Sequence, residues 1–393
     1  MTPLRVSAYS LVSAIGSRAE TTLAALRSRQ GGLRPCDFPE IELDTWIGRV
    51  PDIEDRPLPA PLSAYDCRNN RLAAMALEGD DFSEHVAAAA ALYGRDRIAV
   101  IVGTSTSGIL ESESAYRRRD AASGALPPDF RYRTVHNTFS VADFTRRCLG
   151  LGGPATAIST ACSSSAKAFA SASRLMDAGF CDAAVVGGVD SLCGTTLHGF
   201  HALQLTSARP CRPADTRRDG ISIGEAAGFV LLEKASDAGQ SVQLIGYGES
   251  ADAYHMSSPH PEGAGARLAM QDALQRAGVC PEAVDHVLLH GTGTLANDAA
   301  EDCAIASLLG ERVGCSSIKG WTGHTLGAAG VVNAIIAALS LDAGLLPGTL
   351  QTQEVDPRLR CRILLDNRES AVRYMLCNSF GFGGSNATLL FRR

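Results

Sequence analysis

The chain has 393 residues, a formal net charge of −6 at pH 7, and 45% hydrophobic against 20% charged residues. These proportions match ordinary globular proteins and exclude a disordered, collagen-like or coiled-coil chain. The length allows two domains or one duplicated fold around a large core. The mildly acidic balance disfavours a dedicated nucleic-acid binder.

The N-terminal 16 residues carry only Arg5 as a cation, and serines interrupt their apolar residues, so they do not form a signal peptide. No run is expected to reach the roughly 18 apolar residues that a membrane helix needs, because polar residues interrupt the most apolar late segment, 331–346. The twelve cysteines include no CxxC pair and no Cys/His ligand cluster, so neither a disulfide scaffold nor a metal site is expected. These features predict a cytoplasmic protein without a membrane span.

Short β-rich runs alternate with alanine-rich stretches along the chain. The sequence predicts strands at Ile98–Val102, Ala183–Val186, Val242–Ile245, Val287–Leu289 and Ala387–Phe391. It predicts helices at Ser163–Ala178 and Gly330–Leu341. Several strands are apolar at successive positions, which suits strands covered on both faces. The pattern is typical of a layered α/β protein, with irregular segments over 34–71 and 117–133.

A weak internal repeat connects the two halves of the chain. Val102–Thr106 (VGTST) resembles His290–Thr294 (HGTGT), and each directly follows an apolar strand. Thr160–Cys162 and Thr322–His324 each open a helix of small residues. Two matches in the same order indicate a duplicated fold. In such a fold, Cys162 and His324 occupy related positions in the two halves.

Cys162 lies where a predicted strand ends and the helix Ser163–Ala178 begins. A thiol at a helix N-terminus faces unpaired N–H groups and the positive end of the helix dipole, which lowers its pKa. The small flanking residues allow a tight turn such as a nucleophile elbow. This context fits a nucleophile and a buried structural cysteine alike.

Three further side chains in the second half can carry chemistry. His290 ends an apolar strand, where a core histidine is the alternative. His324 follows a glycine-rich turn that allows close approach of backbone or substrate, and a role in starting the next helix is its alternative. Lys319 lies beside Ile318 and Trp321, which makes a plain surface lysine a poor interpretation.

Asp298 and Glu301 follow the His290 loop with a spacing that places both on one helix face. They can pair with Lys319 or orient a histidine. A solvated first helical turn rich in acids is the alternative.

Residues 378–386 read NSFGFGGSN and follow a strand near the C-terminal end. The pattern is not GxGxxG, and no strand–helix–strand unit follows it, which disfavours dinucleotide binding. Its backbone N–H groups can form half of an oxyanion hole, and Phe380 and Phe382 can act as a gate. A tight turn at a sheet edge is the alternative.

These motifs occur together, in this order, in the β-ketoacyl synthases, and the chain resembles elongating members of that family over essentially its whole length. The most specific matches are Thr160–Ser164, His290–Thr294 with Asp298 and Glu301, Lys319 with Gly323–His324, and Asn378–Asn386. The resemblance implies a duplicated thiolase-like α/β fold, layered αβαβα with buried central helices. It implies halves over residues 1–235 and 236–393.

The resemblance also implies a reaction. Cys162 would attack an acyl thioester on the phosphopantetheine arm of an acyl carrier protein, and backbone N–H groups of Cys162 and Phe382 would hold the oxyanion. His290 and His324 would stabilise the enolate that forms when a malonyl thioester loses its carboxylate. The implied product is a β-ketoacyl thioester, made without a cofactor or metal of the enzyme's own.

Other residues receive supporting roles from the same resemblance. Lys319 would pair with Glu301 and orient His324. Substrate contacts would come from Phe380, Thr292, Thr294 and Ser107. Asn333 departs from the family, since many relatives carry a glutamate nine residues after the second histidine.

The partner implied is an acidic carrier protein, which needs a positive docking surface despite the net charge. Candidate docking residues are Arg131, Arg133, Arg209 and Arg212. The family is usually dimeric, and both a homodimer and a heterodimer with a chain-length-factor-like subunit stay open.

Two segments, Gly103–Ile109 and Ile221–Gly228, resemble stand-alone ketosynthases of bacterial polyene or pigment clusters such as those for aryl polyenes.

Three alternatives to a ketosynthase remain: a non-catalytic chain-length-factor-like subunit, a thiolase that uses CoA substrates, and a structural protein of the same fold. The presence of Cys162 together with His290 and His324 argues against the first. The His290 and Lys319 contexts argue against the second, and thiol reactivity tests the third.

Overall fold

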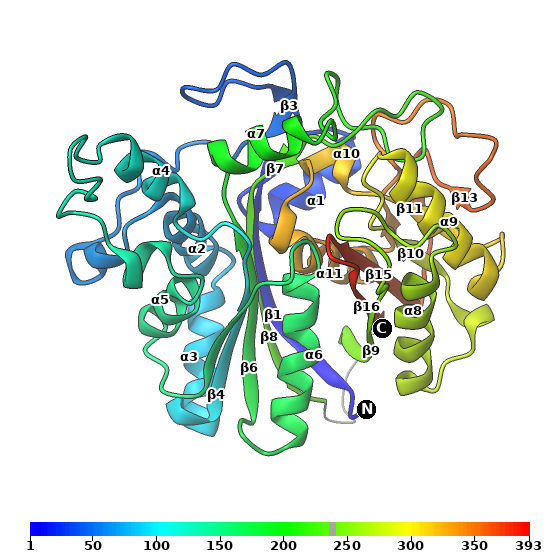
Figure 1. Cartoon of the computed structure of the whole chain (residues 1–393). Helices are drawn as coiled ribbons and strands as arrows, with labels where there is room; N and C mark the ends of the chain where they lie inside the picture. Colours follow the sequence, from blue (N-terminus) through cyan, green and yellow to red (C-terminus); the bar gives the residue numbers. More distant parts are fainter. Residues whose placement is uncertain (236–240) are drawn as a thin grey trace.

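The computed structural model describes residues 1–235 and 241–393 (Figure 1). Within these residues, eleven strands form one mixed sheet in the order β13-β11-β10-β15-β16-β9-β1-β8-β6-β4-β5. Its strands are β1 (Leu4–Ser13), β4 (Ile98–Gly103), β5 (Ala155–Ile158), β6 (Ala183–Asp190), β8 (Ala226–Lys234), β9 (Gln243–Ala251), β10 (His286–Leu288), β11 (Gly314–Ser316), β13 (Arg362–Ile363), β15 (Tyr374–Gly381) and β16 (Ser385–Arg392). Two small sheets join β12 (Leu345–Leu346) to β14 (Arg368–Glu369), and β2 (Arg34–Pro35) and β7 (Ile223–Gly224) to β3 (Trp46–Gly48).

The large sheet consists of two copies of one five-stranded arrangement. The first half has the order β5-β4-β6-β8-β1, and the second has the order β11-β10-β15-β16-β9. In each half the second strand in sequence pairs in parallel with the third and the fourth, and the other pairs are antiparallel. The halves meet where β1 pairs with β9. This repetition confirms the predicted duplicated α/β fold.

Two central helices lie between the halves of the sheet. They are α6 (Ser164–Asp177) and α11 (Ala329–Ala343), and each packs against the other and against strands of both halves. A Cβ added to Gly330 of α11 would lie 2.4 Å from the backbone nitrogen of Ala166 in α6. The two helices therefore touch backbone to backbone, which requires the small residues seen in the sequence.

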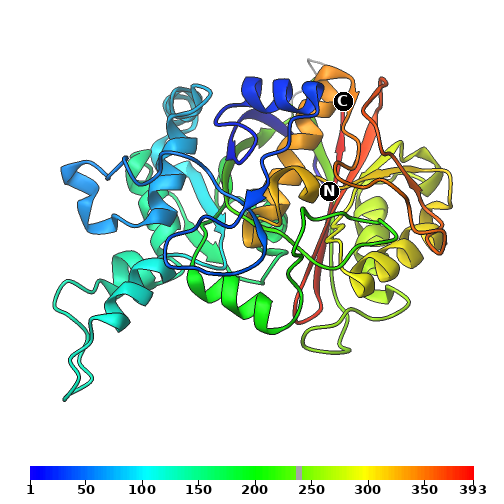
Figure 2. The ribbon, with the colours of Figure 1, turned by 90° about the horizontal axis from the view of Figure 1, so that it is seen from above.

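Outer helices cover the two halves and complete the layers (Figures 1 and 2). The first half is covered by α2 (Arg68–Glu78), α3 (Phe82–Tyr93) and α5 (Ser140–Cys148), and the second by α8 (Ala264–Ala277) with α9 (Leu295–Leu309) packed on it. The remaining helices are α1 (Ala19–Ser28), α4 (Ile109–Arg117), α7 (Gly194–Ala202) and α10 (Lys319–Thr322). Together the layers follow the expected αβαβα order.

The predicted elements are present, although β6 and β9 run four and six residues beyond their predicted ends. The five predicted strands correspond to β4, β6, β9, β10 and β16, and the two predicted helices correspond to α6 and α11. One expectation needs correction, because Leu326–Ala343 is long and apolar enough to cross a membrane by composition. However, 89% of this segment is buried inside the protein, between the halves of the sheet, so it is a core helix.

Candidate active site

Cys162 stands in the connection from β5 to α6 and is buried. The residue before it, Ala161, has a φ of +51°. A residue other than glycine adopts this backbone conformation only when its surroundings enforce it. Here the Ser164 hydroxyl donates to the Ala161 carbonyl at 2.5 Å and accepts from the Thr160 N–H at 2.9 Å. This sharp turn presents the thiol in the way that the sequence predicts for a nucleophile.

The pKa of the Cys162 thiol is raised, whereas the sequence predicts a lowered one. Burial raises the pKa of Cys162 to about 11, although the Lys319 cation and the Phe382 N–H act to lower it. The helix N-terminus therefore does not produce a resting thiolate, because removal of water from the charged sulfur is the larger effect. At neutral pH the sulfur is a thiol in the free protein.

Two backbone N–H groups face the sulfur from opposite segments. The N–H of Phe382 and the N–H of Cys162 itself both act to stabilise a charge on Sγ. The hairpin between β15 and β16 comes so close that a Cβ on Gly381 would lie 2.7 Å from the Thr160 carbonyl oxygen. This arrangement suits an oxyanion hole made of one N–H from each segment.

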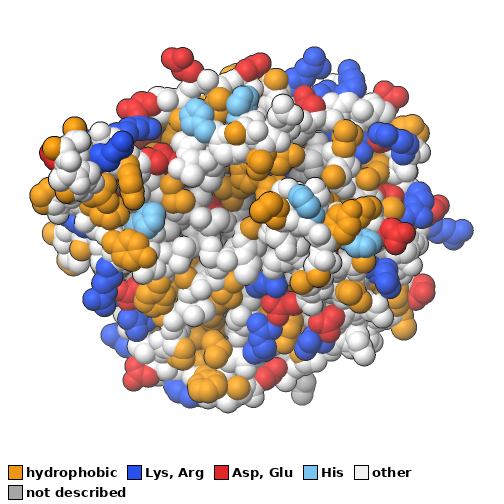
Figure 3. Space-filling model, in the orientation of Figure 1, with side chains coloured by type: hydrophobic (Ala, Val, Ile, Leu, Met, Phe, Trp, Pro, Cys, Tyr) orange, Lys and Arg blue, Asp and Glu red, His pale blue; other side chains and the backbone are white. Residues whose placement is uncertain are grey.

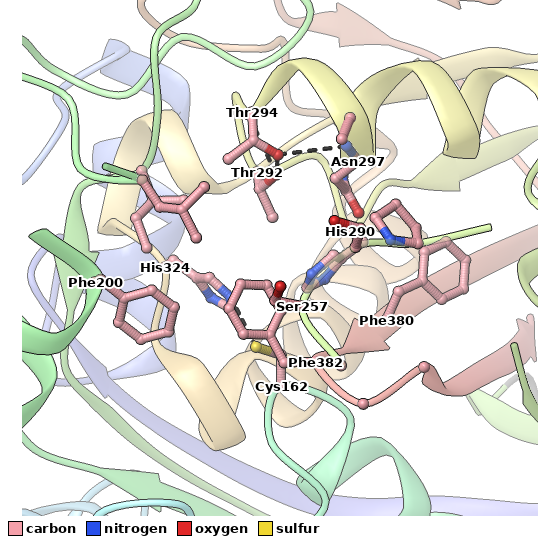
Figure 4. A pocket seen from close by; sticks show the side chains of 18 of the residues that line it. Cys162, Phe200, Ser257, His290, Thr292, Thr294, Asn297, His324, Phe380 and Phe382 are labelled. Carbon is pink, nitrogen blue, oxygen red and sulfur yellow. Dashed lines mark hydrogen bonds between the residues drawn. The ribbon is translucent and has the colours of Figure 1, made fainter. Parts of the chain in front are cut away.

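His324 contacts the nucleophile directly, with its Nε2 3.1 Å from the Sγ of Cys162 (Figure 4). Its Nδ1 accepts the backbone N–H of Leu326 at 3.2 Å. A neutral imidazole that accepts at Nδ1 carries its proton on Nε2. His324 therefore directs an N–H toward the reacting centre.

His290 lies beside His324, with the two ring centres 5.3 Å apart. Its Nδ1 is 3.5 Å from the ammonium of Lys319, which can only donate, so its proton also sits on Nε2. Burial, with a further contribution from the Lys319 cation, lowers the pKa of both histidines well below the usual value. Both rings are therefore neutral donors at physiological pH.

The expected ion pair between Lys319 and Glu301 does not form, because each residue contacts a different partner. Lys319 donates to the carbonyl oxygen of His290, and the Glu301 carboxylate acts on its charge only through the electric field, without a hydrogen bond to it. Glu301 instead accepts the backbone N–H groups of His290 and Gly291, both at 2.8 Å, and the amide of Asn378 at 3.0 Å. Both residues therefore orient His290 through its backbone, and neither contacts His324.

Cys162, His290 and His324 bring their ligand-type atoms within 4.8 Å of one another, a grouping that sequence spacing alone did not suggest. A metal would need the lone pairs of both Nε2 atoms. The contacts to both Nδ1 atoms keep protons on Nε2, and a shift of the proton to Nδ1 would place it against the Leu326 N–H or the Lys319 ammonium. The geometry therefore favours two hydrogen-bond donors over two metal ligands.

The three side chains lie at the inner end of a cavity of about 320 Å³ (Figure 4). Phe380, Thr292 and Thr294, which the resemblance assigns to substrate contacts, line it, and the two threonine hydroxyls are 2.9 Å apart. Phe382 lies against Phe200, with ring centres 5.6 Å apart, so two aromatic rings stand beside the thiol. On the outer face, apolar side chains gather around a hollow (Figure 3).

Two residues assigned from the sequence lie elsewhere. Ser107 does not line the cavity, because its hydroxyl donates to the carbonyls of Val135 and Asn137. Arg212 is only 9% exposed, and its guanidinium donates to the Arg217 carbonyl, so it lacks the exposure that docking requires.

Asn333 is buried on α11 and bridges β15 to the segment between β10 and His290. Its amide donates to the carbonyl of Leu289, which precedes His290, at 3.3 Å. It also donates to the carbonyl of Asn378 in β15 at 3.2 Å. A glutamate here would set a carboxylate against two carbonyl oxygens in this arrangement, so the amide is the side chain that fits.

Sequence reasoning missed Phe200, Ser257 and Asn297, which also line the cavity. Nothing local distinguishes them, since their positions follow only from how α7, the loop after β9 and α9 meet. It also missed Asp190. A charged residue that ends the apolar strand Ala183–Asp190 is a signal that could have identified it.

The raised pKa of Cys162 leads to a testable pH dependence. Because only the thiolate reacts, alkylation of Cys162 by iodoacetamide should rise about tenfold per pH unit from pH 7 to pH 10. Peptide mapping would separate Cys162 from the exposed Cys148 and Cys280. A rate that levels off below pH 8 would contradict the buried-thiol assignment.

Comparison with known proteins agrees with this geometry. Family models described as the N-terminal and C-terminal domains of β-ketoacyl synthase match residues 71–238 and 242–353. A 3-oxoacyl-[acyl-carrier-protein] synthase 2 from Vibrio cholerae is 32% identical, covering 99% of this chain and 98% of its own length. One from Rhizobium meliloti is 38% identical over 75% of this chain and 73% of its own.

Solved structures resemble the chain over its whole length. The ketosynthase ApeO from Xenorhabdus doucetiae, in complex with its chain length factor ApeC, has a TM-score of 0.90 at 36% identity, covering 100% of this chain and 98% of its own. The ishigamide ketosynthase/chain length factor has a TM-score of 0.90 at 27% identity, covering 100% and 99%. The chain belongs to the β-ketoacyl synthase family of condensing acyltransferases.

Proposed function

We propose that this protein extends an acyl chain held on Cys162 by decarboxylative condensation with a malonyl group on an acyl carrier protein. One observation supports this most directly: a thiol, two Nε2–H donors and two backbone N–H groups meet at the inner end of one cavity. The phosphopantetheine arm belongs to the carrier substrate. The protein acts on it as a cytoplasmic enzyme.

The first step loads the acyl chain. The sulfur of Cys162 forms a bond to the thioester carbon of the incoming acyl carrier, and the bond from that carbon to the pantetheine sulfur breaks. The thiol proton leaves with the departing pantetheine as its thiol. The N–H groups of Cys162 and Phe382 hold the oxyanion of the tetrahedral intermediate.

The second step forms the new carbon–carbon bond. The malonyl thioester loses its carboxylate as CO₂, and His290 and His324 donate their Nε2–H groups to the enolate oxygen. The enolate carbon attacks the acyl carbon, the bond to the sulfur of Cys162 breaks, and the sulfur takes a proton from solvent. Neutral donors suit this role because they remain neutral over the physiological pH range.

An intact mass measured after mixing the protein with short-chain acyl carrier protein tests the loading step. We expect a mass gain equal to the acyl group, located at Cys162 by peptide mapping and absent in Cys162→Ala. If several chain lengths give no adduct and thiol reagents also fail at Cys162, the protein is a non-catalytic subunit instead. Adducts from acyl-CoA but from no acyl carrier protein would indicate a CoA-dependent thiolase.

The carrier docks through Arg131, Arg133 and Arg209, which are exposed. Figures 1 and 2 place segment 117–133 on the opposite side of α7 from α9. Reversal of charge at Arg131 and Arg133 should raise the KM for acyl carrier protein at low salt about tenfold and leave kcat unchanged.

The control for this experiment is the same change of charge elsewhere on the surface. Arg27→Glu with Arg312→Glu alters two exposed arginines that line neither this segment nor the cavity. An equal loss in both double variants would show a general charge effect. Unchanged kinetics in the Arg131 and Arg133 variant would remove these residues from the docking surface.

We further propose that the protein pairs with a chain-length-factor-like subunit and builds a polyene chain. The support is the similarity to ApeO and to the ishigamide ketosynthase, both solved with such subunits. Loading activity of the chain alone, compared with the same chain supplied with a candidate partner, separates this heterodimer from a homodimer.

A further inference from the structure

Asp190 ends β6 and has no exposed surface. One carboxylate oxygen accepts four hydrogen bonds from the loop after β4: from the Ser105 N–H at 2.7 Å, from the Thr106 N–H and hydroxyl at 2.8 Å, and from the Thr104 hydroxyl at 2.9 Å. The other oxygen accepts the Gly327 N–H at 2.5 Å. One buried carboxylate therefore joins a loop of the first half to a turn of the second.

The turn at Gly327 lies next to the backbone amide that contacts the ring of His324. Gly327 directly follows Leu326, whose N–H is the donor to His324 Nδ1. Leu326 is buried and has a φ of +50°, a strained conformation for a residue with a side chain. Such a turn persists only when contacts outside it hold it in place, and the Asp190 contact lies on the next residue.

The backbone of His324 is fixed separately. Its N–H donates to the Ser222 carbonyl at 2.7 Å, and its carbonyl accepts the Gly224 N–H at 3.0 Å. Loss of the Asp190 contact would therefore leave the ring near Cys162 and would free the Leu326 amide that selects the tautomer. This separation makes the two effects distinguishable.

We propose that Asp190 is a positioning residue for condensation, which holds the Leu326–Gly327 turn so that His324 keeps its proton on Nε2. The inference rests on the proposed function for its kinetic consequence, whereas the tautomer can be measured without any substrate. Glu301 orients His290 through backbone N–H groups in the same way. Each histidine of the site would then depend on one buried carboxylate that never touches substrate.

The test is Asp190→Asn. The amide can keep the four donors of the first loop on its oxygen, but its NH₂ group then faces the Gly327 N–H, donor against donor. Side-chain ¹⁵N NMR at pH 7, with the His324 signals assigned through His324→Gln, should show Nε2–H alone in the wild type and a mixture of tautomers in the variant. Malonyl condensation should lose about 10- to 100-fold in kcat while the KM for the malonyl carrier stays within about twofold.

Two further variants keep the result decisive. Asp182→Asn is the control. Asp182 directly precedes β6, is partly exposed and pairs with Arg97, so its replacement should leave the His324 tautomer and kcat unchanged. If Asp190→Asn does not fold, Gly327→Ala replaces it, because a Cβ there would lie 2.6 Å from the Ser105 hydroxyl oxygen and 2.7 Å from the Asp190 oxygen and would push the carboxylate and its loop away from the turn. A folded variant with wild-type His324 signals and wild-type kcat would overturn the proposal. A wild type that shows the Nε2–H tautomer but never condenses would contradict the proposed function alone.

Discussion

Replacement of His290 by alanine should lower the rate of malonyl condensation by about 10²–10³ and leave loading of Cys162 within a few-fold of wild type. His290 directs one of the two Nε2–H donors toward the cavity but makes no hydrogen bond to the sulfur, whereas His324 does. The enolate oxygen would lose one donor, while the oxyanion hole that serves loading keeps both of its backbone N–H groups. Single-turnover loading followed by malonyl addition measures the two steps separately.

A second buried histidine, on the strand that leads to His290, supplies the control. His286 opens β10, has no exposed surface and bonds Ser316 through Nε2 at 2.8 Å, away from the cavity. His286→Asn should therefore leave both steps close to wild type in the folded protein. If loading falls as much as condensation in His290→Ala, His290 acts on the nucleophile, and its assignment to the enolate is wrong.

The sequence was most informative where chemistry and local structure share one segment. Cys162 at a strand–helix junction and the glycine-rich loop around Phe382 both lie where their patterns predict. The internal repeat likewise predicts that Cys162 and His324 occupy equivalent connections, since each follows the third strand of its half and precedes a central helix. Local pattern was sufficient there because the turn and its neighbouring elements are contiguous in the chain.

The errors concern contacts between distant segments. The helix end predicts an acidic thiol at Cys162, but the burial that outweighs it depends on side chains brought together from distant segments, such as Phe200, His324 and Phe382. The partner of Lys319 was also missed. It is a backbone carbonyl, which every residue has, so the sequence does not identify it. Asp190 was missed for a related reason, since its donors come from both halves of the chain.

Replacement of Lys319 by methionine should slow condensation by about 10²-fold and at the same time raise the melting temperature. Lys319 is a buried cation whose pKa is lowered by burial and which pairs with no carboxylate of the described residues, so its charge costs folding free energy. Methionine keeps most of the volume and removes that cost. The variant also loses the donor that holds the His290 carbonyl and keeps the proton of His290 on Nε2.

The loss should fall mainly on condensation, because Lys319 contacts His290 and influences Cys162 only through its field. Loading at pH 7 should slow by a few-fold, since the pKa of the thiol rises further without the cation. Lys167→Met, which removes a lysine that lies 3.6 Å from Glu249, is the control and should leave condensation unchanged. Lys319→Ala separates charge from packing: equal condensation in the alanine and methionine variants indicates that the ammonium itself is required. Normal condensation in either variant would show that Lys319 does not position His290.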